Sequence, residues 1–362
     1  MIGLLTSPYR RSSLRALAGG FLLAIGAACS SDGVGPSPEA AVPADSALAP
    51  PLDTTVATPS DSTLPAPTDS TVLPPIDSTD LSGTAVPALD PRSKLPGIVF
   101  ASDNIPLQYF NSVHNGSKYG GVITPSNVMK FLADARAKGG RLFLKLHKGA
   151  DSYVKNADGT FSLTKWKALV NSYRNLDFGP YIADGTIVAH FIIDEPHRAA
   201  KWGGKIIPHA TVEAMAQYSK QIWPTWTTIT HTQMTWLASA PFSYRYLDAG
   251  WSHYAAGKGE LNKWIAGEIA GAKSKRLGLL MGLNVLDGGN GSSGIKGWAS
   301  GKWAMSASEL RTYGTAVLNQ SYACAFFMWA HDLSYYGRSD IKSAMATLST
   351  KAKAHPKTSC QQ

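Results

Sequence analysis

The chain has 362 residues and a formal net charge of +9, but its composition is uneven. Residues 30–94 hold nine acidic and two basic residues with almost no aromatic side chains, so they cannot bury a core. Residues 95–362 carry all ten tryptophans, and their 29 basic against 16 acidic residues give a charge of +13. This excludes a uniform two-domain protein and leaves one enzyme-sized domain, whose charge fits either acidic partners or a spread of solvated lysines.

The first residues have the pattern of an export signal. Three arginines within residues 10–15 precede an apolar run over residues 17–28, which is too short to span a bilayer and ends in small residues before Cys29. We therefore expect residues 1–28 to be a signal peptide.

The residues around the cysteine resemble the bacterial lipobox. Gly26, Ala27 and Ala28 precede Cys29, with Gly26 where leucine is usual and Ile25 one place earlier. The resemblance implies cleavage before Cys29, lipidation of its thiol and anchoring to the cell envelope. Because serines and not aspartate follow the cysteine, the outer membrane or cell surface is the expected address. The alternative is an ordinary secretory signal that is cut nearby.

Residues 29–94 contain a short repeat after the cysteine. An aspartate followed by serine or threonine recurs every eight residues, with prolines between, at Asp45, Asp53, Asp61, Asp69 and Asp77. Such Pro-rich sequence favours extended conformations that need no core. We expect a disordered linker that reaches up to ~200 Å, at ~3.1 Å per residue.

Residues 95–362 alternate short apolar runs with amphipathic segments, the pattern of parallel α/β domains. We predict strands at residues 97–102, 141–146, 186–193, 227–232, 246–252, 277–284 and 323–330. We predict helices at residues 125–137, 163–173, 210–222, 261–272, 306–318 and 341–352. Seven strands over this length predict a (β/α)8 TIM-barrel-like domain with one strand unrecognised. An open doubly wound sheet is the alternative, although no phosphate-binding glycine motif follows the first strand.

Polar and aromatic side chains cluster where the predicted strands end. In a barrel, the carboxyl ends of the strands meet at the active-site mouth. We therefore predict a substrate-binding set of Asp103, Lys145, His147, Asp194, His231, Asp248, Trp251, His253, Asn284 and Trp329.

The third predicted strand runs directly into Asp194, Glu195 and Pro196. This end resembles the Asn-Glu-Pro or Asp-Glu-Pro strand end of barrel-fold glycoside hydrolases, in which the glutamate is the general acid/base. The resemblance implies that Glu195 is the catalytic acid. Desolvation at the lip of an apolar strand would suit that role by raising the pKa of the carboxyl group. The alternative is a surface salt bridge that begins a loop.

Two features depart from the best-known clan of these enzymes, in which the acid follows strand four and a second glutamate ends strand seven. Here Glu195 follows the third predicted strand, and no glutamate ends a late strand. The candidates for the second catalytic carboxylate are, in order of preference, Asp332, Asp287, Asp103 and Asp248, whereas Asp194 could instead orient Glu195.

Tryptophans support a sugar-binding mouth, because their flat apolar rings suit the C–H faces of sugars. Four of them lie at or beyond late strand ends: Trp251, Trp298, Trp303 and Trp329. Core packing is the alternative for each.

Other chemistries find less support. Histidines recur in the strands, but no zinc-binding pair at short spacing exists, and no Gly-x-Ser-x-Gly motif of esterases is present. We expect no metal and no cofactor. If Cys29 carries lipid, Cys324 and Cys360 remain to form a disulfide in an oxidising compartment, and two free thiols are the alternative.

The sequence thus predicts a surface-anchored glycoside hydrolase-like protein that acts on an extracellular polysaccharide or oligosaccharide. We expect a monomer that contacts the membrane through the lipid on Cys29 and binds no nucleic acid. The alternatives are a noncatalytic glycan-binding protein on the same scaffold and a basic scaffold that binds the anionic envelope.

Overall fold

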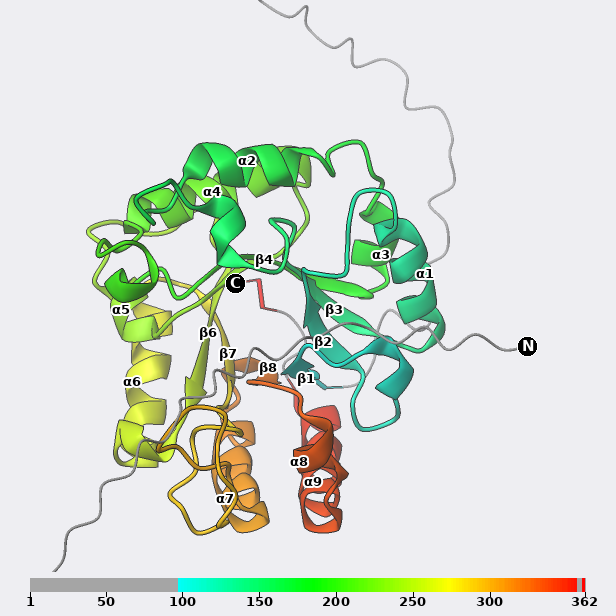
Figure 1. Ribbon diagram of the computed structural model, residues 1–362, viewed down its shortest axis with the longest axis vertical. Helices are drawn as coiled ribbons and strands as arrows, with labels where there is room; N and C mark the ends of the chain where they lie inside the picture. The colour runs from blue at the N-terminus through cyan, green and yellow to red at the C-terminus, as the bar shows by residue number, and fades with distance from the viewer. Residues whose placement is uncertain (1–96, 357–359, 362) are drawn as a thin grey trace, which may run out of the picture. The chain divides into compact units, whose positions relative to one another are not determined.

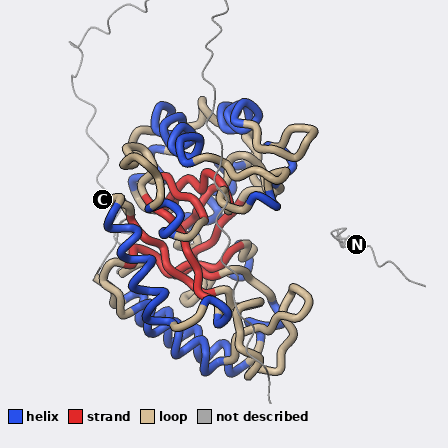
Figure 2. The backbone as a smooth tube through the Cα atoms, turned by 90° about the vertical axis from the view of Figure 1, so that its left-hand side faces the viewer, coloured by secondary structure: helices blue, strands red, loops and turns tan. Residues whose placement is uncertain are grey.

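The computed structural model describes residues 97–356, 360 and 361. Within them, eight parallel strands close into a barrel in sequence order, with β8 paired to β1. Helices surround the strands, as Figures 1 and 2 show. The predicted (β/α)8 fold is confirmed. The predicted signal peptide, Cys29 and the linker lie outside the described residues.

The strands are short and largely buried. They are β1 (Val99–Asp103), β2 (Gly116–Tyr119), β3 (Arg141–Leu144), β4 (Ile187–Asp194), β5 (Thr228–His231), β6 (Ala249–Tyr254), β7 (Gly278–Leu283) and β8 (Ala323–Met328). Seven of them overlap the predicted strands, since burial on both faces makes parallel strands near-continuous apolar runs.

The helices follow the amphipathic segments. They are α1 (Val128–Ala137), α2 (Leu163–Asn171), α3 (Gly179–Ala183), α4 (His209–Ile222), α5 (Met234–Ala238), α6 (Leu261–Ser274), α7 (Ala307–Leu318), α8 (Leu333–Gly337) and α9 (Ser339–Lys353). The sequence did not predict α3, α5 and α8, which have only five residues each. At α7, Ser306 and Glu309 form a capping box.

The unrecognised strand is β2, with the sequence Gly-Ser-Lys-Tyr. It has no apolar run because Gly116 packs closely against β1 and Lys118 bonds to a buried carboxylate at the mouth. No α-helix connects β1 to β2, only a 3-10 turn at Leu107–Tyr109. Counting β2 moves every later strand up by one, so Glu195 follows the fourth strand and one departure from the hydrolase pattern disappears.

The barrel interior is packed with side chains. Phe143, Phe191, Trp251 and Phe327 fill its middle, and the Trp251 and Phe327 rings stack with centroids 4.2 Å apart. A barrel of eight strands is just wide enough for such filling. Access to the interior is therefore restricted to its ends.

The tail closes the amino-terminal end of the barrel. The predicted disulfide between Cys324 in β8 and Cys360 is present, and Cys360 packs with the interior side chains. A Cβ atom on Gly278 would lie 2.2 Å from the Cys360 carbonyl oxygen, so only glycine fits beside the tail. The carboxyl end of the barrel is the end that this tail does not cover. None of the described helices is long and apolar enough to cross a membrane.

Candidate active site

A chain of hydrogen bonds crosses the carboxyl ends of β4, β5 and β6. Asp194 Oδ1 lies 2.6 Å from His231 Nδ1, and His231 Nε2 lies 3.1 Å from His253 Nδ1. Ile229 and Trp251 lie two positions before His231 and His253, and both belong to the barrel interior. Because alternate residues of a strand face the same side, the two histidines also face inward, at the mouth. The structure thus brings three predicted site residues into contact.

The charges around Asp194 fix its ionisation. Burial by itself would raise its pKa, but the hydrogen bond and charge of His231, together with Lys118 and Lys201, hold the pKa well below its ordinary value. Burial lowers the pKa of His253 well below its ordinary value, and the charges of His231 and Lys258 add to this effect. At neutral pH, Asp194 is therefore a carboxylate and His253 a neutral imidazole.

Lys201 lies close to three carboxylates. Its Nζ contacts Asp194 Oδ2 and lies 3.0 Å from Asp151 Oδ2 and 3.6 Å from Glu195 Oε2. Lys145 Nζ bonds to the other oxygen of Asp151 at 2.9 Å. Burial would lower the pKa of Lys201, but Asp194 and Asp151 outweigh it and raise the pKa. Because one ammonium group contacts both, the carboxylates of Asp194 and Glu195 are close neighbours.

A separate ion pair lies at the ends of β1 and β2. Lys118 Nζ is 2.9 Å from Asp103 Oδ2, and both side chains are almost fully buried. The ammonium lies 4.4 Å from the centre of the Phe191 ring. Asp103 is thus at the mouth, as predicted, but it is already bonded to a cation.

Glu195 is the first residue after β4 and has a left-handed backbone, with φ of 48°. Its backbone N–H donates to the His231 carbonyl oxygen at 2.8 Å, and its carbonyl oxygen accepts from Trp202 Nε1 at 3.1 Å. Arg198 Nη1 contacts both carboxylate oxygens, at 2.9 and 2.8 Å. Glu195 is therefore held by its backbone and paired with a cation.

The Glu195 side chain opens onto a cavity of about 290 Å³ at the ends of β4, β5 and β6. Its lining is Glu195, His197, Arg198, His231, Thr232, Gln233, Ser252, His253 and Lys258. Its size is at the lower end of the ~300–1,000 Å³ typical of ligand pockets, so it admits one small group and not a length of polymer. We call it the mouth pocket.

The other two predicted catalytic carboxylates have structural partners. Asp332 caps α8 by accepting from the Tyr335 backbone N–H at 2.9 Å. Partial burial would raise its pKa, but hydrogen bonds, chiefly from Ser334 and the Tyr335 backbone, lower it. Asp287 accepts from the Ala299 backbone N–H at 2.9 Å. In the described part of the chain, neither forms a hydrogen bond or ion pair with Glu195.

An aromatic pair of one exposed and one partly buried tryptophan lies near Asp332. Trp298 is 56% exposed, and its ring meets that of Trp329 edge to face, with centroids 5.4 Å apart. Asn284, another predicted site residue, forms an isolated β-bridge with Trp329. These residues follow β7 and β8 and form an apolar wall of the kind that sugars contact.

Three predicted substrate-binding residues are not placed to contact substrate. Trp251 is fully buried, and its Nε1 donates to the Phe327 carbonyl oxygen. His147 is also fully buried and packs against Trp166 of α2, on the helix side of the barrel. Asp248 precedes β6, at the opposite end of the barrel from the mouth, and pairs with Lys220. We therefore remove all three from the candidate site.

Five charged residues at the mouth were not predicted from the sequence: Lys118, Asp151, Arg198, Lys201 and Lys258. Four of them lie in loops and 3-10 turns after strands, where no periodicity marks them. Lys118 lies in the unrecognised strand. The available signal for Arg198 and Lys201 was their position three and six residues beyond Glu195.

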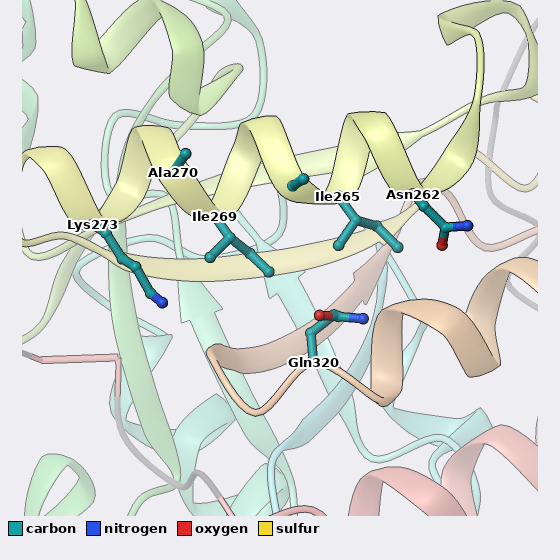
Figure 3. Close-up of a pocket in the computed structure, with 7 residues that line it drawn as sticks. Asn262, Ile265, Ile269, Ala270, Lys273 and Gln320 are labelled. Atoms are coloured by element: carbon teal, nitrogen blue, oxygen red, sulfur yellow. The ribbon is translucent and has the colours of Figure 1, made fainter.

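Two further hollows lie away from this network. One, of about 440 Å³, lies between α6 and Gln320, toward which Ile265, Ile269 and Lys273 point in Figure 3; its lining is Asn262, Ile265, Ala266, Ile269, Ala270, Lys273 and Gln320. The other, of about 710 Å³, lies between residues 108–114 and side chains of α8 and α9. Neither lining includes a carboxylate, so neither offers acid/base chemistry with paired acids. Residues 97–356 also hold no group of three or more His, Cys, Asp or Glu arranged for a metal ion.

Comparison with known proteins gives similarity in fold. No family model and no curated protein matches the chain. Among solved structures, a GH18 chitinase from Pseudoalteromonas aurantia is 10% identical, with 69% of this chain and 99% of that chain covered and a TM-score of 0.41. The catalytic domain of the major endoglucanase from Xanthomonas campestris pv. campestris is 11% identical, with 71% of this chain and 94% of that chain covered and a TM-score of 0.42. Xylanase 10B from Thermotoga maritima is 10% identical, with 72% of this chain and 97% of that chain covered and a TM-score of 0.45. The chain is thus a (β/α)8 barrel that resembles glycoside hydrolase catalytic domains at low identity, and the likeness carries no argument about activity.

Proposed function

We propose that this chain is an envelope-anchored glycoside hydrolase with Glu195 as its proton donor. One observation carries the proposal: Glu195 opens into a cavity at the carboxyl mouth of the barrel, beside an ionised Asp194. Glycoside hydrolysis typically uses two carboxyl groups, one to protonate the leaving oxygen and one ionised. This pair replaces the Asp332 and Asp287 candidates.

The two carboxyl groups would have different roles. Asp194 remains ionised because His231 and Lys201 bond to its two oxygens, so it can stabilise the positive charge that develops on the sugar ring. Glu195 would donate a proton to the glycosidic oxygen. The sugar would approach along the Trp298 and Trp329 wall.

One observation favours the alternative of a noncatalytic glycan-binding protein. Both oxygens of Glu195 are bonded to Arg198 Nη1, so the carboxylate is already occupied by a cation. Proton donation requires Arg198 to leave at least one oxygen. If it stays in place when glycan binds, the mouth binds sugars without cleaving them.

The first test measures reducing ends released from a panel of polysaccharides. We expect Glu195→Gln to lower the rate on the cleaved polymer by about 10²-fold or more, as for loss of a general acid. Asp134→Asn, which removes an exposed carboxylate on α1 whose one ion-pair partner among the described residues is Lys130, is the matched control and should keep full activity. Equal activity of Glu195→Gln and the parent chain would remove Glu195 from the mechanism, and no cleavage of any polymer would favour the glycan-binding alternative.

Anchoring belongs to the same proposal. The basis is the signal and lipobox-like sequence before Cys29 and the Pro-rich linker that follows. A lipid at Cys29 and a linker of this length would let the domain reach polymer beyond the membrane surface.

A further inference from the structure

The lining of the mouth pocket includes two basic side chains, Arg198 and Lys258, and one carboxylate, Glu195. Arg198 contacts Glu195 through Nη1 alone. Its Nε and Nη2 form no hydrogen bond with residues 97–356, and the side chain is 57% exposed. The face of the guanidinium that binds carboxylates with two parallel bonds is therefore open.

Lys258 is the second cation of the pocket. Its Nζ donates to the His253 carbonyl oxygen at 2.5 Å, which fixes the ammonium beside the pocket. Within the described residues it forms no ion pair at contact distance. Burial lowers the pKa of Lys258, and the nearby charges of Glu268 and Glu195 act in the opposite direction. An ammonium has three donors, and this bond uses one of them.

The other polar groups of the pocket add no further negative charge. Thr232 bonds to His197 Nδ1 at 2.8 Å, and burial lowers the pKa of His197. Among the lining residues, two basic side chains, Arg198 and Lys258, therefore face one carboxylate, Glu195. The whole domain is basic as well, which favours the approach of anionic polymers.

We propose that the mouth pocket binds an anionic substituent of a glycan, a sugar carboxylate or a sulfate ester, through Arg198 and Lys258. This rests on the proposed function and names its substrate class as acidic polysaccharide. The anion binds the open Nε and Nη2 face of the guanidinium, whereas Nη1 contacts Glu195. The anion and Glu195 then share one guanidinium charge, so the anion weakens the contact between Arg198 and Glu195.

The test is calorimetric binding of small oligosaccharides to the full chain. The ligands are trigalacturonate, its methyl ester, and a sulfated carrageenan oligosaccharide. We expect an acidic ligand to bind at least about tenfold more tightly than the ester, since charge-assisted bonds are about twice as strong as neutral ones. Comparison of trigalacturonate with the sulfated ligand identifies which anion the pocket takes. An ester that binds as tightly as both acids would overturn the proposal.

Variants link binding to the pocket. Arg198→Ala/Lys258→Ala should weaken acidic binding at least about tenfold, whereas Arg174→Ala/Lys138→Ala, which removes the same charge from exposed positions, should leave it unchanged. Glu195→Gln should tighten it several-fold, because Arg198 then no longer shares its charge with a carboxylate. Equal weakening by both double variants would mean that only net charge matters and would overturn the proposal, as would unchanged affinity in Glu195→Gln.

The two proposals fail in different ways. Acidic ligands that bind through Arg198 and Lys258 without being cleaved would end the hydrolase proposal and leave the anion pocket standing. A chain that cleaves neutral glycans through Glu195 and does not discriminate acid from ester would keep the hydrolase and end the anion pocket. Matching thermal unfolding curves for parent and variants would establish that each variant is folded.

Discussion

The two carboxylate oxygens of Asp194 are bonded to different side chains at the mouth, one to His231 and the other to Lys201. We expect Asp194→Asn to lower the free energy of unfolding by about 2–3 kcal/mol, which is less than the loss of a fully buried pair because the side chain is 23% exposed. Urea unfolding at pH 7 measures this, with Asp134→Asn as control. If Asp194→Asn changes the free energy of unfolding as little as Asp134→Asn does, the two bonds of Asp194 do not stabilise the fold.

The lowered pKa of Asp194 predicts that the free energy of unfolding depends on pH. Because folding lowers the pKa of Asp194, its stabilisation is present above the ordinary aspartate pKa of about 3.9 and is lost as pH falls through the folded value. The stability difference between the parent chain and Asp194→Asn should therefore shrink as pH falls below about 4. Unfolding measurements from pH 7 to pH 2.5 test this, and a difference that grows on acidification would contradict it.

Residue positions were predictable where a strand end is followed by a polar side chain. Asp103, Lys145, Asp194, His231 and His253 all lie at the mouth for this reason. The errors have physical causes as well. The strand that contained Asp248 was predicted to begin at residue 246 but begins at Ala249, so Asp248 lies before the strand, away from the mouth. The sequence also does not tell whether an aromatic ring at a strand end, such as Trp251, fills the interior or faces solvent.

At the scale of elements, the disulfide joins β8 to the tail across 36 positions of sequence. We expect Cys360→Ser to lower the free energy of unfolding by about 3–4 kcal/mol in the chain-entropy model. Urea unfolding of parent and variant, with and without reductant, measures it. Reductant should destabilise the parent chain alone, and equal sensitivity of the variant would contradict the assignment.

Elements were predictable in proportion to their length and apolar content. The buried strands and the helices of nine or more residues were recognisable from their periodicity. The four residues of β2 and the five-residue helices carry too little pattern. Missing β2 had a consequence for function, because it placed Glu195 after the wrong strand.

At the scale of the whole molecule, the charge of the domain predicts salt dependence. Binding of trigalacturonate should weaken several-fold between about 50 and 500 mM NaCl, because ions screen the attraction between charges. Binding of a neutral oligosaccharide should stay constant. Calorimetry at the two salt concentrations checks this, and equal salt dependence for both ligands would argue against a charged pocket.

The anchoring proposal also belongs to this scale. In the native host, Cys29→Ser should move the chain from the membrane fraction to the soluble fraction, and incorporation of labelled palmitate should be lost. Immunoblots of the fractions and the radiolabel measure the two effects. Membrane association that persists without label would contradict lipid anchoring at Cys29.

The central claim is that Glu195 protonates the leaving oxygen. Its most direct test compares kcat/KM of Glu195→Gln on an unactivated oligosaccharide and on the dinitrophenyl glycoside of the same sugar, whose leaving group needs no proton. We predict a loss of about 10²-fold or more on the first substrate and less than about tenfold on the second. Equal losses on both substrates, or no loss on either, would contradict it.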